Sequence, residues 1–152
     1  MLNKIGWIIL IYTNETKKAL KLCFDIHKNQ LDKSGLPYVF HPFHLAEQME
    51  DEDSTIVALL HDVVEDSSIT FDDLKKMGFS EKVIEALKLL THKPGVPYMT
   101  YILKIKSNPL AKIVKLADLR HNSDLSRLNN IGPADLKRKE KYERAIELLS
   151  CK

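Results

Sequence analysis

The sequence predicts an all-α protein, built as one domain of roughly eight helices. Apolar residues recur at helical spacing through most of the chain. No segment alternates apolar and polar residues with the period of a half-buried strand. The 5 Gly and 6 Pro stand between the periodic segments, where they interrupt helices. A length of 152 residues suits a single domain with a substantial core.

The first predicted helix lies in NETKKALKLCFDIHKNQL. Thr13 or Asn14 stands where a helix N-terminus prefers a side-chain oxygen that can bond the free backbone N–H groups. The stretch DKSGLPY that follows is a predicted turn, because Gly35 and Pro37 both break helices.

Two further helices are expected in PFHLAEQME and DSTIVALLHDVVED. Pro42 falls in the first turn of one, where its missing N–H costs no hydrogen bond. Asp53 or Ser54 would cap the other, which is predicted as one continuous helix over residues 53–66.

The second half of the chain is also predicted to be helical. Short helices in TFDDLKKMG and SEKVIEALKLLTH have their own capping residues, Thr70 and Ser80. VPYMTYILKIKS is expected to form a helix, and so is NPLAKIVKLADLRHNSDLSRL, with Asn108 as cap and Pro109 in the first position. A last helix is expected to start near Pro133 and to run to the C-terminus.

The N-terminal stretch MLNKIGWIILIY, residues 1–12, is predicted to be an apolar leader that precedes a domain over residues 13–152. It is too short to cross a bilayer. The stretch YTNETKK, which begins at Tyr12 at the end of the leader, does not resemble a signal-peptide cleavage site. The leader is expected to pack on the domain or to derive from an upstream start codon.

The charge balance indicates neither a nucleic-acid nor a membrane partner. There are 23 Lys and Arg against 21 Asp and Glu, which gives a formal net charge of +2. The basic run DLKRKEKYER alternates with acids, as a solvated helix face does. Cys23 and Cys151 have no metal-type spacing and suggest no disulfide framework, so a cytoplasmic location is expected.

The stretch ALLHDVVED places His61, Asp62, Glu65 and Asp66 inside an apolar run. On a continuous helix, at about 100° per residue, these four side chains form one polar face opposite an apolar one. A solvent-facing stripe would explain the acids but not the His–Asp step beside them. A bound metal ion explains both, and imidazole with carboxylate suits manganese, iron, magnesium or zinc.

Two adjacent side chains cannot complete a coordination shell, so other helices must supply further ligands. The sequence offers His41 before the cluster and Asp118 in KLADLRHN after it. Lys115 and Asn122 fall on the same side of that later helix as Asp118. Such side chains can converge in the core of a helical bundle, which is a known way to build a metal site.

The order His41, His61-Asp62, Asp118 resembles the HD superfamily of metal-dependent phosphohydrolases, named for the His-Asp pair. DKSGLPYVFHP, ALLHDVVEDS and VKLADLRHN are similar to the hydrolase domain of the RelA/SpoT group, over about residues 15–130. Those enzymes remove the 3′-pyrophosphate from guanosine tetra- and pentaphosphate alarmones in a manganese-dependent reaction. The resemblance therefore implies an HD-type helical bundle, a divalent cofactor, Mn²⁺, and a phosphorylated nucleotide substrate.

The resemblance also implies roles for individual residues. Glu65 and Asp66 match a pair that orients and activates water. The implied metal ligands are His41, His61, Asp62 and Asp118.

On the substrate side, Lys33 and Ser34 match residues that contact the nucleotide, and Asn122 matches one that lines the same pocket. Lys115 and Lys33 could neutralise phosphates. The alarmone hydrolases usually carry Arg, which holds the guanine nucleotide, where this chain has Asp32, and Glu where it has Leu36. An acid at that position reverses the charge offered to a polyanionic substrate.

Three functions follow from the sequence. The favoured one is guanosine 3′,5′-bis(diphosphate) 3′-pyrophosphohydrolase-like activity. The alternatives are an HD hydrolase for another nucleotide or phosphoester, and a nucleotide-binding sensor without turnover. Retention of all the implied ligands together with Glu65 and Asp66 favours an enzyme over a sensor. A purely structural partner protein would need no metal.

Overall fold

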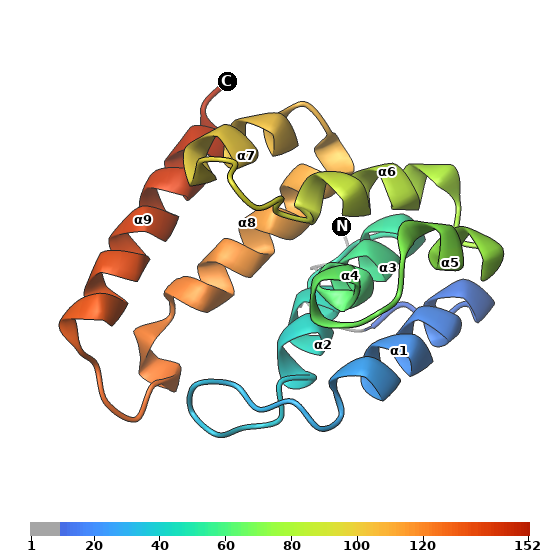
Figure 1. Ribbon diagram of the computed structural model, residues 1–152, viewed down its shortest axis with the longest axis horizontal. Helices are drawn as coiled ribbons and strands as arrows, with labels where there is room; N and C mark the ends of the chain where they lie inside the picture. Colours follow the sequence, from blue (N-terminus) through green and yellow to red (C-terminus); the bar gives the residue numbers. More distant parts are fainter. Residues whose placement is uncertain (1–9) are drawn as a thin grey trace, which may run out of the picture.

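The computed structural model describes residues 10–152, and within them the expected all-α fold class is confirmed. These residues form nine α-helices and one 3-10 helix, with no strand (Figure 1). In chain order they are α1 (Asn14–His27), α2 (Phe40–Glu47), α3 (Glu52–Leu60), α4 (Val63–Asp66), α5 (Phe71–Lys76), α6 (Glu81–Leu90), α7 (Tyr98–Lys106), α8 (Pro109–Ser123), η1 (Leu125–Arg127) and α9 (Pro133–Ser150).

The predicted leader, residues 1–12, lies mostly outside the described residues, and its boundary stays a prediction. Leu10 is buried in the hydrophobic core, and the backbone carbonyl of Ile11 accepts a hydrogen bond from the Thr16 hydroxyl at 2.6 Å. Within residues 10–152, no helix is both long enough and apolar enough to cross a membrane.

The cap predicted at Asp53 or Ser54 is wrong, but the structure uses the four other predicted helix caps. Each accepts a hydrogen bond from the backbone N–H three residues further on, which satisfies one of the free donors of its helix. These caps are Thr13, Thr70, Ser80 and Asn108. Pro109 is the first residue of α8, as predicted, and Pro133 is the first residue of α9.

The predicted continuous helix over residues 53–66 is wrong. Its N-cap is Asp51, and the helix is interrupted after Leu60, so that α3 and α4 are separate. Asp62 lies at φ −106° and ψ −1°, in the sparsely populated region between helix and strand, and ends the regular hydrogen-bonding pattern. The interruption explains why nine α-helices are found in the described residues where about eight were expected.

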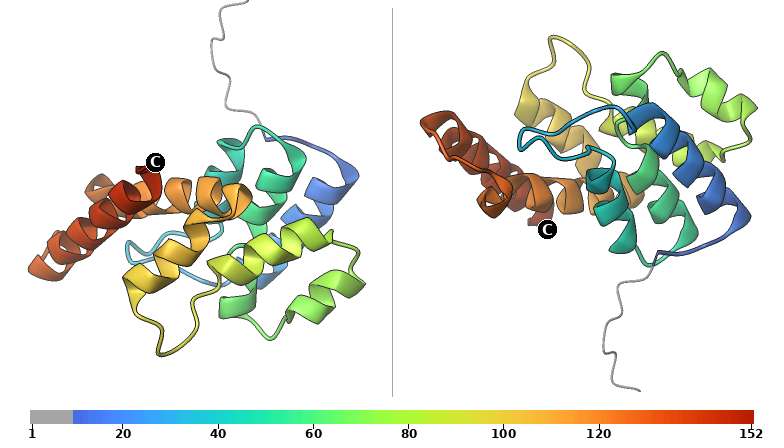
Figure 2. Two further views of the ribbon diagram at one scale, coloured as in Figure 1. Left: turned by 90° about the horizontal axis from the view of Figure 1, so that it is seen from above. Right: turned by 90° about the horizontal axis from the view of Figure 1, so that it is seen from below.

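Helix α3 lies at the centre of the fold and contacts α1, α2, α6 and α8. Residues 56–60 are almost completely buried, as expected of a helix that is apolar on every side. Helix α8 runs between this group and α9, which packs along α8 and α7 at the far side of the molecule (Figures 1 and 2). The end of α3 and the middle of α8 are therefore held next to each other by the core.

The cap of α3 gives a pH-dependent test of this arrangement. Hydrogen bonds from the backbone N–H and the hydroxyl of Ser54 lower the pKa of Asp51 below its ordinary value of 3.8. Because the folded-state pKa is lowered, the cap stabilises the protein above pH 3.8, and this contribution is lost as the pH falls through the folded-state value. We expect Asp51→Ala to lower the free energy of unfolding by about 1 kcal/mol at neutral pH in urea denaturation.

Asp51→Asn is the matched control, since Asn is an equally good cap without the charge. It should keep most of the stability and lose the pH dependence. An Asp51→Ala variant as stable as the unaltered protein at neutral pH would contradict the assigned cap.

Candidate metal centre

Four side chains from three helical segments meet beside the end of α3. His41 lies in the first turn of α2, His61 and Asp62 lie at the break between α3 and α4, and Asp118 lies in α8. His41 Nε2 is 3.1 Å from Asp118 Oδ1, and His61 Nε2 is 3.0 Å from Asp62 Oδ2 and 3.8 Å from Asp118 Oδ1. The structure thus brings together all the side chains that the sequence predicted as metal ligands.

Asp118 is a buried carboxylate surrounded by positive or polar groups. Its Oδ2 accepts a hydrogen bond from Lys115 Nζ at 2.8 Å, and its Oδ1 accepts one from Asn122 Nδ2 at 2.7 Å. Burial alone would raise the pKa of Asp118, but Lys115 and the imidazoles of His41 and His61 outweigh it and hold the pKa well below its usual value. Asp118 is therefore ionised.

His61 presents its Nε2 nitrogen to this cluster. Its Nδ1–H donates to the Ala58 carbonyl at 2.7 Å, so the lone pair of a neutral ring is on Nε2. Nε2 is buried and has no hydrogen-bond partner among the described residues, although carboxylate oxygens of Asp62 and Asp118 lie close to it. Lone pairs that face one another in this way need a positive charge between them.

A proton or a divalent cation meets that need. Burial lowers the pKa of His61, but the carboxylates of Asp62 and Asp118 outweigh it and raise the pKa to about 9. A six-coordinate ion with bonds of about 2.1 Å holds neighbouring ligand atoms about 3 Å apart. Ligand atoms of His41, His61 and Asp62 all lie within 4.8 Å of one another. The residues present therefore fit a divalent metal ion.

Tyr38 is a site residue that the sequence analysis missed. Its hydroxyl donates to Asp62 Oδ2, and its ring packs against the rings of His27 and His41. Burial, followed by the charge of Asp62, raises the pKa of the Tyr38 hydroxyl, so it stays a donor. The only feature of the sequence that could have indicated Tyr38 is its position three residues before His41.

The predicted catalytic pair is divided by the structure. Glu65 lines a cavity of about 170 Å³ together with His61, Asp62 and Asp118, and its Oε1 accepts the backbone N–H of His92 at 2.7 Å. Asp66 accepts a hydrogen bond from Gln30 Nε2 at 3.2 Å and does not line this cavity. Partial removal from water raises the pKa of Glu65 above 4.5, the His92 N–H opposes this rise, and the charge of Asp62 adds to it.

A second cavity, of about 290 Å³, lies on the other side of the cluster and includes His41 and Asn122. Lys33 and Ser34, which were predicted to contact the nucleotide, line this cavity, and the Ser34 hydroxyl donates to the Arg127 carbonyl at 2.5 Å. Lys115 lies instead in the smaller cavity.

Asp32 shapes the loop that carries Lys33 and Ser34. Its Oδ1 accepts the backbone N–H groups of Ser34 at 2.8 Å and Leu36 at 3.0 Å, and Gly35 between them adopts φ +79°. The carboxylate therefore closes the turn, a common use of Asp in loops.

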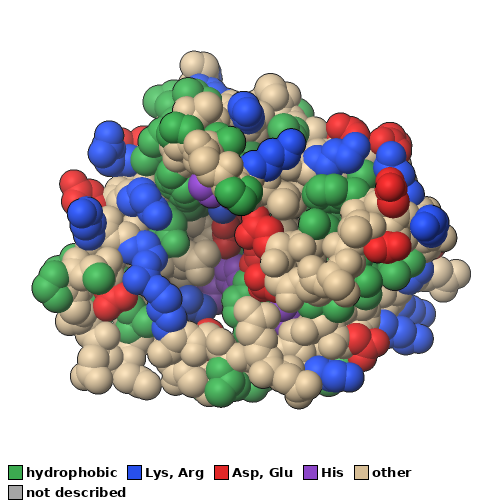
Figure 3. Space-filling model, viewed as in Figure 1, with side chains coloured by type: hydrophobic (Ala, Val, Ile, Leu, Met, Phe, Trp, Pro, Cys, Tyr) green, Lys and Arg blue, Asp and Glu red, His purple; other side chains and the backbone are tan. Residues whose placement is uncertain are grey.

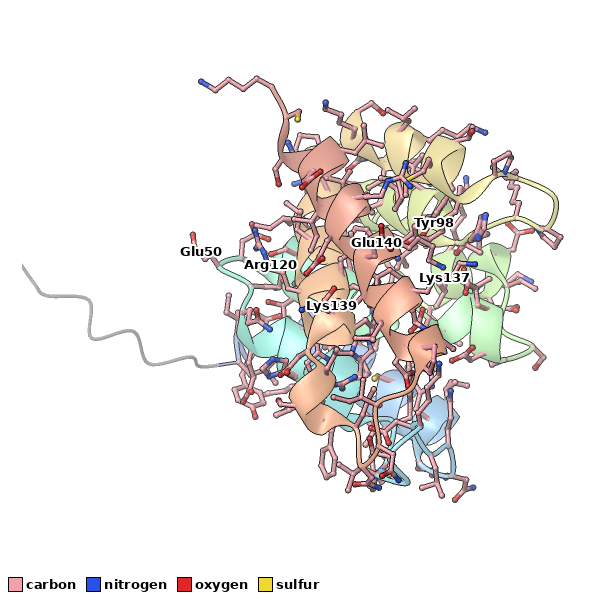
Figure 4. The ribbon with its side chains drawn as sticks, turned by 90° about the vertical axis from the view of Figure 1, so that its left-hand side faces the viewer. Glu50, Tyr98, Arg120, Lys137, Lys139 and Glu140 are labelled. Atoms are coloured by element: carbon pink, nitrogen blue, oxygen red, sulfur yellow. The ribbon has the colours of Figure 1, made fainter. Side chains whose placement is uncertain are left out.

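The face of Figure 3 is hollowed at this site, with acidic and histidine side chains inside the hollow and Lys and Arg side chains along one rim. Arg127 and Arg138 line the second cavity, and the sequence analysis missed both because they follow the motifs in the chain. Arg120 is exposed and lines neither cavity; in Figure 4 it lies on the opposite side of α9 from Tyr98, which lines the smaller cavity.

The fold and the site define this protein as an all-α HD-type domain with a histidine and aspartate cluster that fits a divalent ion. No known protein-family profile matches the chain. A solved structure of a metazoan ortholog of SpoT, described as hydrolysing ppGpp, superimposes with a TM-score of 0.74 and 24% identity over 93% of this chain and 89% of that one. At this identity the likeness shows the fold.

Sequence comparison points to the RelA/SpoT hydrolases. The chain is 28% identical, over 88% of its length, to guanosine-3′,5′-bis(diphosphate) 3′-pyrophosphohydrolase of Aquifex aeolicus. It is 31% identical, over 70% of its length, to the bifunctional (p)ppGpp synthase/hydrolase SpoT of Escherichia coli. It spans 20% and 17% of those two proteins. The chain therefore belongs to the RelA/SpoT hydrolase family, as the resemblance predicted, and it spans about a fifth of the length of these relatives.

The cluster predicts stabilisation by divalent ions. An ion that binds only the folded state at about 100 times its Kd adds about 2.7 kcal/mol to the free energy of unfolding. We expect Mn²⁺ to raise the melting temperature of the unaltered protein and Asp62→Ala to abolish the rise. Asp66→Ala is the matched control, because this neighbouring carboxylate lies outside the cluster, and it should keep the rise. Equal rises in both variants would remove Asp62 from the ligand set.

Proposed function

We propose that this chain is a metal-dependent phosphohydrolase that acts on a phosphorylated nucleotide, and that its reaction is removal of the 3′-pyrophosphate from guanosine 3′,5′-bis(diphosphate). The main support is the convergence of His41, His61, Asp62 and Asp118 around one point, with Glu65 in the same cavity. The names of the similar proteins support the choice of substrate.

The proposed cofactor is Mn²⁺, bound by the two imidazoles and the two aspartates. This mixed nitrogen and oxygen set suits a borderline to hard divalent ion. When bound, such an ion lowers the pKa of a coordinated water and polarises a phosphoryl oxygen. The protein holds the ligands in place through the Ala58 carbonyl on His61, the Tyr38 hydroxyl on Asp62 and Lys115 on Asp118.

Glu65 is the proposed general base. Its Oε1 is held by the His92 N–H, which leaves Oε2 free to take a proton from a water molecule in the cavity. A raised pKa suits this role, because a base works best when its pKa approaches the working pH. Asp66 is proposed as a positioning residue that fixes α4 through Gln30.

The second cavity is the proposed site for the remainder of the nucleotide. Lys33, Arg127 and Arg138 offer positive charge there, and Asn122 connects the cavity to Asp118. Cationic side chains of this kind bind phosphate oxygens through charge-assisted hydrogen bonds.

The proposal is tested by incubating the purified protein with guanosine 3′,5′-bis(diphosphate) and Mn²⁺ and measuring pyrophosphate release. Turnover of this substrate supports the proposal. If the protein hydrolyses only other nucleotides or phosphoesters, the proposed enzyme class holds and the proposed substrate is wrong. If the protein binds a nucleotide but hydrolyses none of these compounds, the result supports a nucleotide-binding sensor.

The role of Glu65 predicts a separation of metal binding from turnover. Loss of a general base typically lowers the rate about 10²- to 10⁴-fold. We expect Glu65→Gln to lower kcat by this order while the rise in melting temperature with Mn²⁺ is kept. Glu143→Gln, at an exposed site on α9, is the control and should leave kcat unchanged. Normal turnover in Glu65→Gln would refute its assigned role.

The charge of Asp32 predicts an effect on substrate affinity. Asp32→Arg would remove both hydrogen bonds that close the loop, so it would change the loop and the charge together. Asp32→Asn retains an oxygen acceptor and removes only the charge. If the acid repels the alarmone, Asp32→Asn should lower KM for it several-fold with little change in kcat. An unchanged KM would show that the charge does not limit binding.

A further inference from the structure

The second ring nitrogen of His41 contacts another imidazole. His41 Nδ1 is 2.6 Å from His121 Nδ1, and the two ring planes are 17° apart. The ring centroids are 4.9 Å apart, close to the largest separation that such a contact between ring nitrogens allows. The two nitrogens therefore point at each other in the planes of their rings, as in a well-aligned hydrogen bond.

Only one hydrogen fits between these nitrogens, so one ring donates and the other accepts. If His41 is to bind a cation through Nε2, which faces Asp118, its hydrogen must be on Nδ1, and His121 must accept it. The equivalent partner of His61 is the Ala58 carbonyl, which can only accept. His41 depends instead on the state of a second side chain.

Arg127 contacts His121 without occupying the lone pair that faces His41. Its Nη1 is 3.2 Å from His121 Nδ1 and 3.1 Å from Nε2, so it lies over the face of the ring and not on the in-plane lone pair of either nitrogen. The in-plane position on His121 Nδ1 is therefore left to His41.

We propose that His121 is a positioning residue of the metal centre: it accepts the Nδ1–H of His41 and so holds His41 in the tautomer whose Nε2 binds the cation. Partners of this kind are usually carboxylates, carbonyls or water, and their loss typically lowers metal affinity about 10- to 100-fold. The inference rests on the metal centre of the proposed function and adds the residue that orients one of its ligands.

The test measures the affinity of the full chain for Zn²⁺ and Mn²⁺ by competition with a chelating dye. We expect His121→Ala to bind about 10- to 100-fold more weakly. His121→Asn places an amide oxygen near the position of Nδ1 and should recover most of the affinity. His44→Ala is the matched control, because His44 packs on the His121 ring but makes no hydrogen bond to His41 in the described structure.

Affinity in His121→Ala equal to that of the unaltered protein would overturn the inference, and so would an Asn variant as weak as the Ala variant. If His121→Ala does not fold, nitrogen-15 spectra of the unaltered protein with Zn²⁺ decide the question. A His41 protonated at Nδ1 supports the inference, and one bound through Nδ1 overturns it. An unaltered protein that binds neither ion would overturn the proposed metal centre itself, which separates that failure from a failure of His121.

Discussion

The buried carboxylate of Asp118 is the constraint around which the site is arranged. A charge in the core is costly unless it is paired, and Asp118 is paired on both oxygens. Lys115 and Asn122 come from its own helix, so two of the compensating groups are present as soon as α8 forms. The imidazoles of His41 and His61 lie against the remaining side. Positions in α2, α3 and α8 are thereby linked through one carboxylate, and the apolar packing of α3 against α2 and α8 holds them there.

The break between α3 and α4 decides what the His-Asp pair can do. Adjacent residues in a regular helix point about 100° apart, which would direct His61 and Asp62 to different neighbours. The conformation of Asp62 departs from the helix, and both side chains approach one point, with a ring nitrogen and a carboxylate oxygen 3.0 Å apart. The same break places Glu65 in the cavity and leaves Asp66 beside Gln30. The adjacent residues Glu65 and Asp66 therefore lie in different surroundings, one in the cavity and the other against Gln30.

Local features of the structure were predictable from the sequence, and features that depend on distant residues were not. Capping residues such as Thr70 and Asn108 act on neighbours three positions away, so their roles could be predicted without the fold. The residues of the cluster were found because imidazole and carboxylate are unusual in apolar segments. The break at Asp62 was missed because the apolar periodicity continues across it. The contacts of His121 with His41 and of Arg127 with Ser34 join residues 80 and 93 positions apart, and no local pattern indicates them.

The two cavities are lined by different residues and would serve different parts of the proposed reaction. The smaller one is lined by His61, Asp62, Asp118 and Glu65, which in the proposed reaction would activate water and stabilise a phosphoryl group. The larger one mixes cations, Lys33, Arg127 and Arg138, with the acids Asp32, Asp124 and Asp135. These three basic and three acidic side chains leave the charge of the cavity close to balanced. Since Asp32 also closes the loop that carries Lys33, the acid contributes to the loop's structure as well as to the charge of the cavity. In this chain, a substitution of Asp32 that keeps an oxygen acceptor would therefore change the charge of the cavity and leave the loop closed.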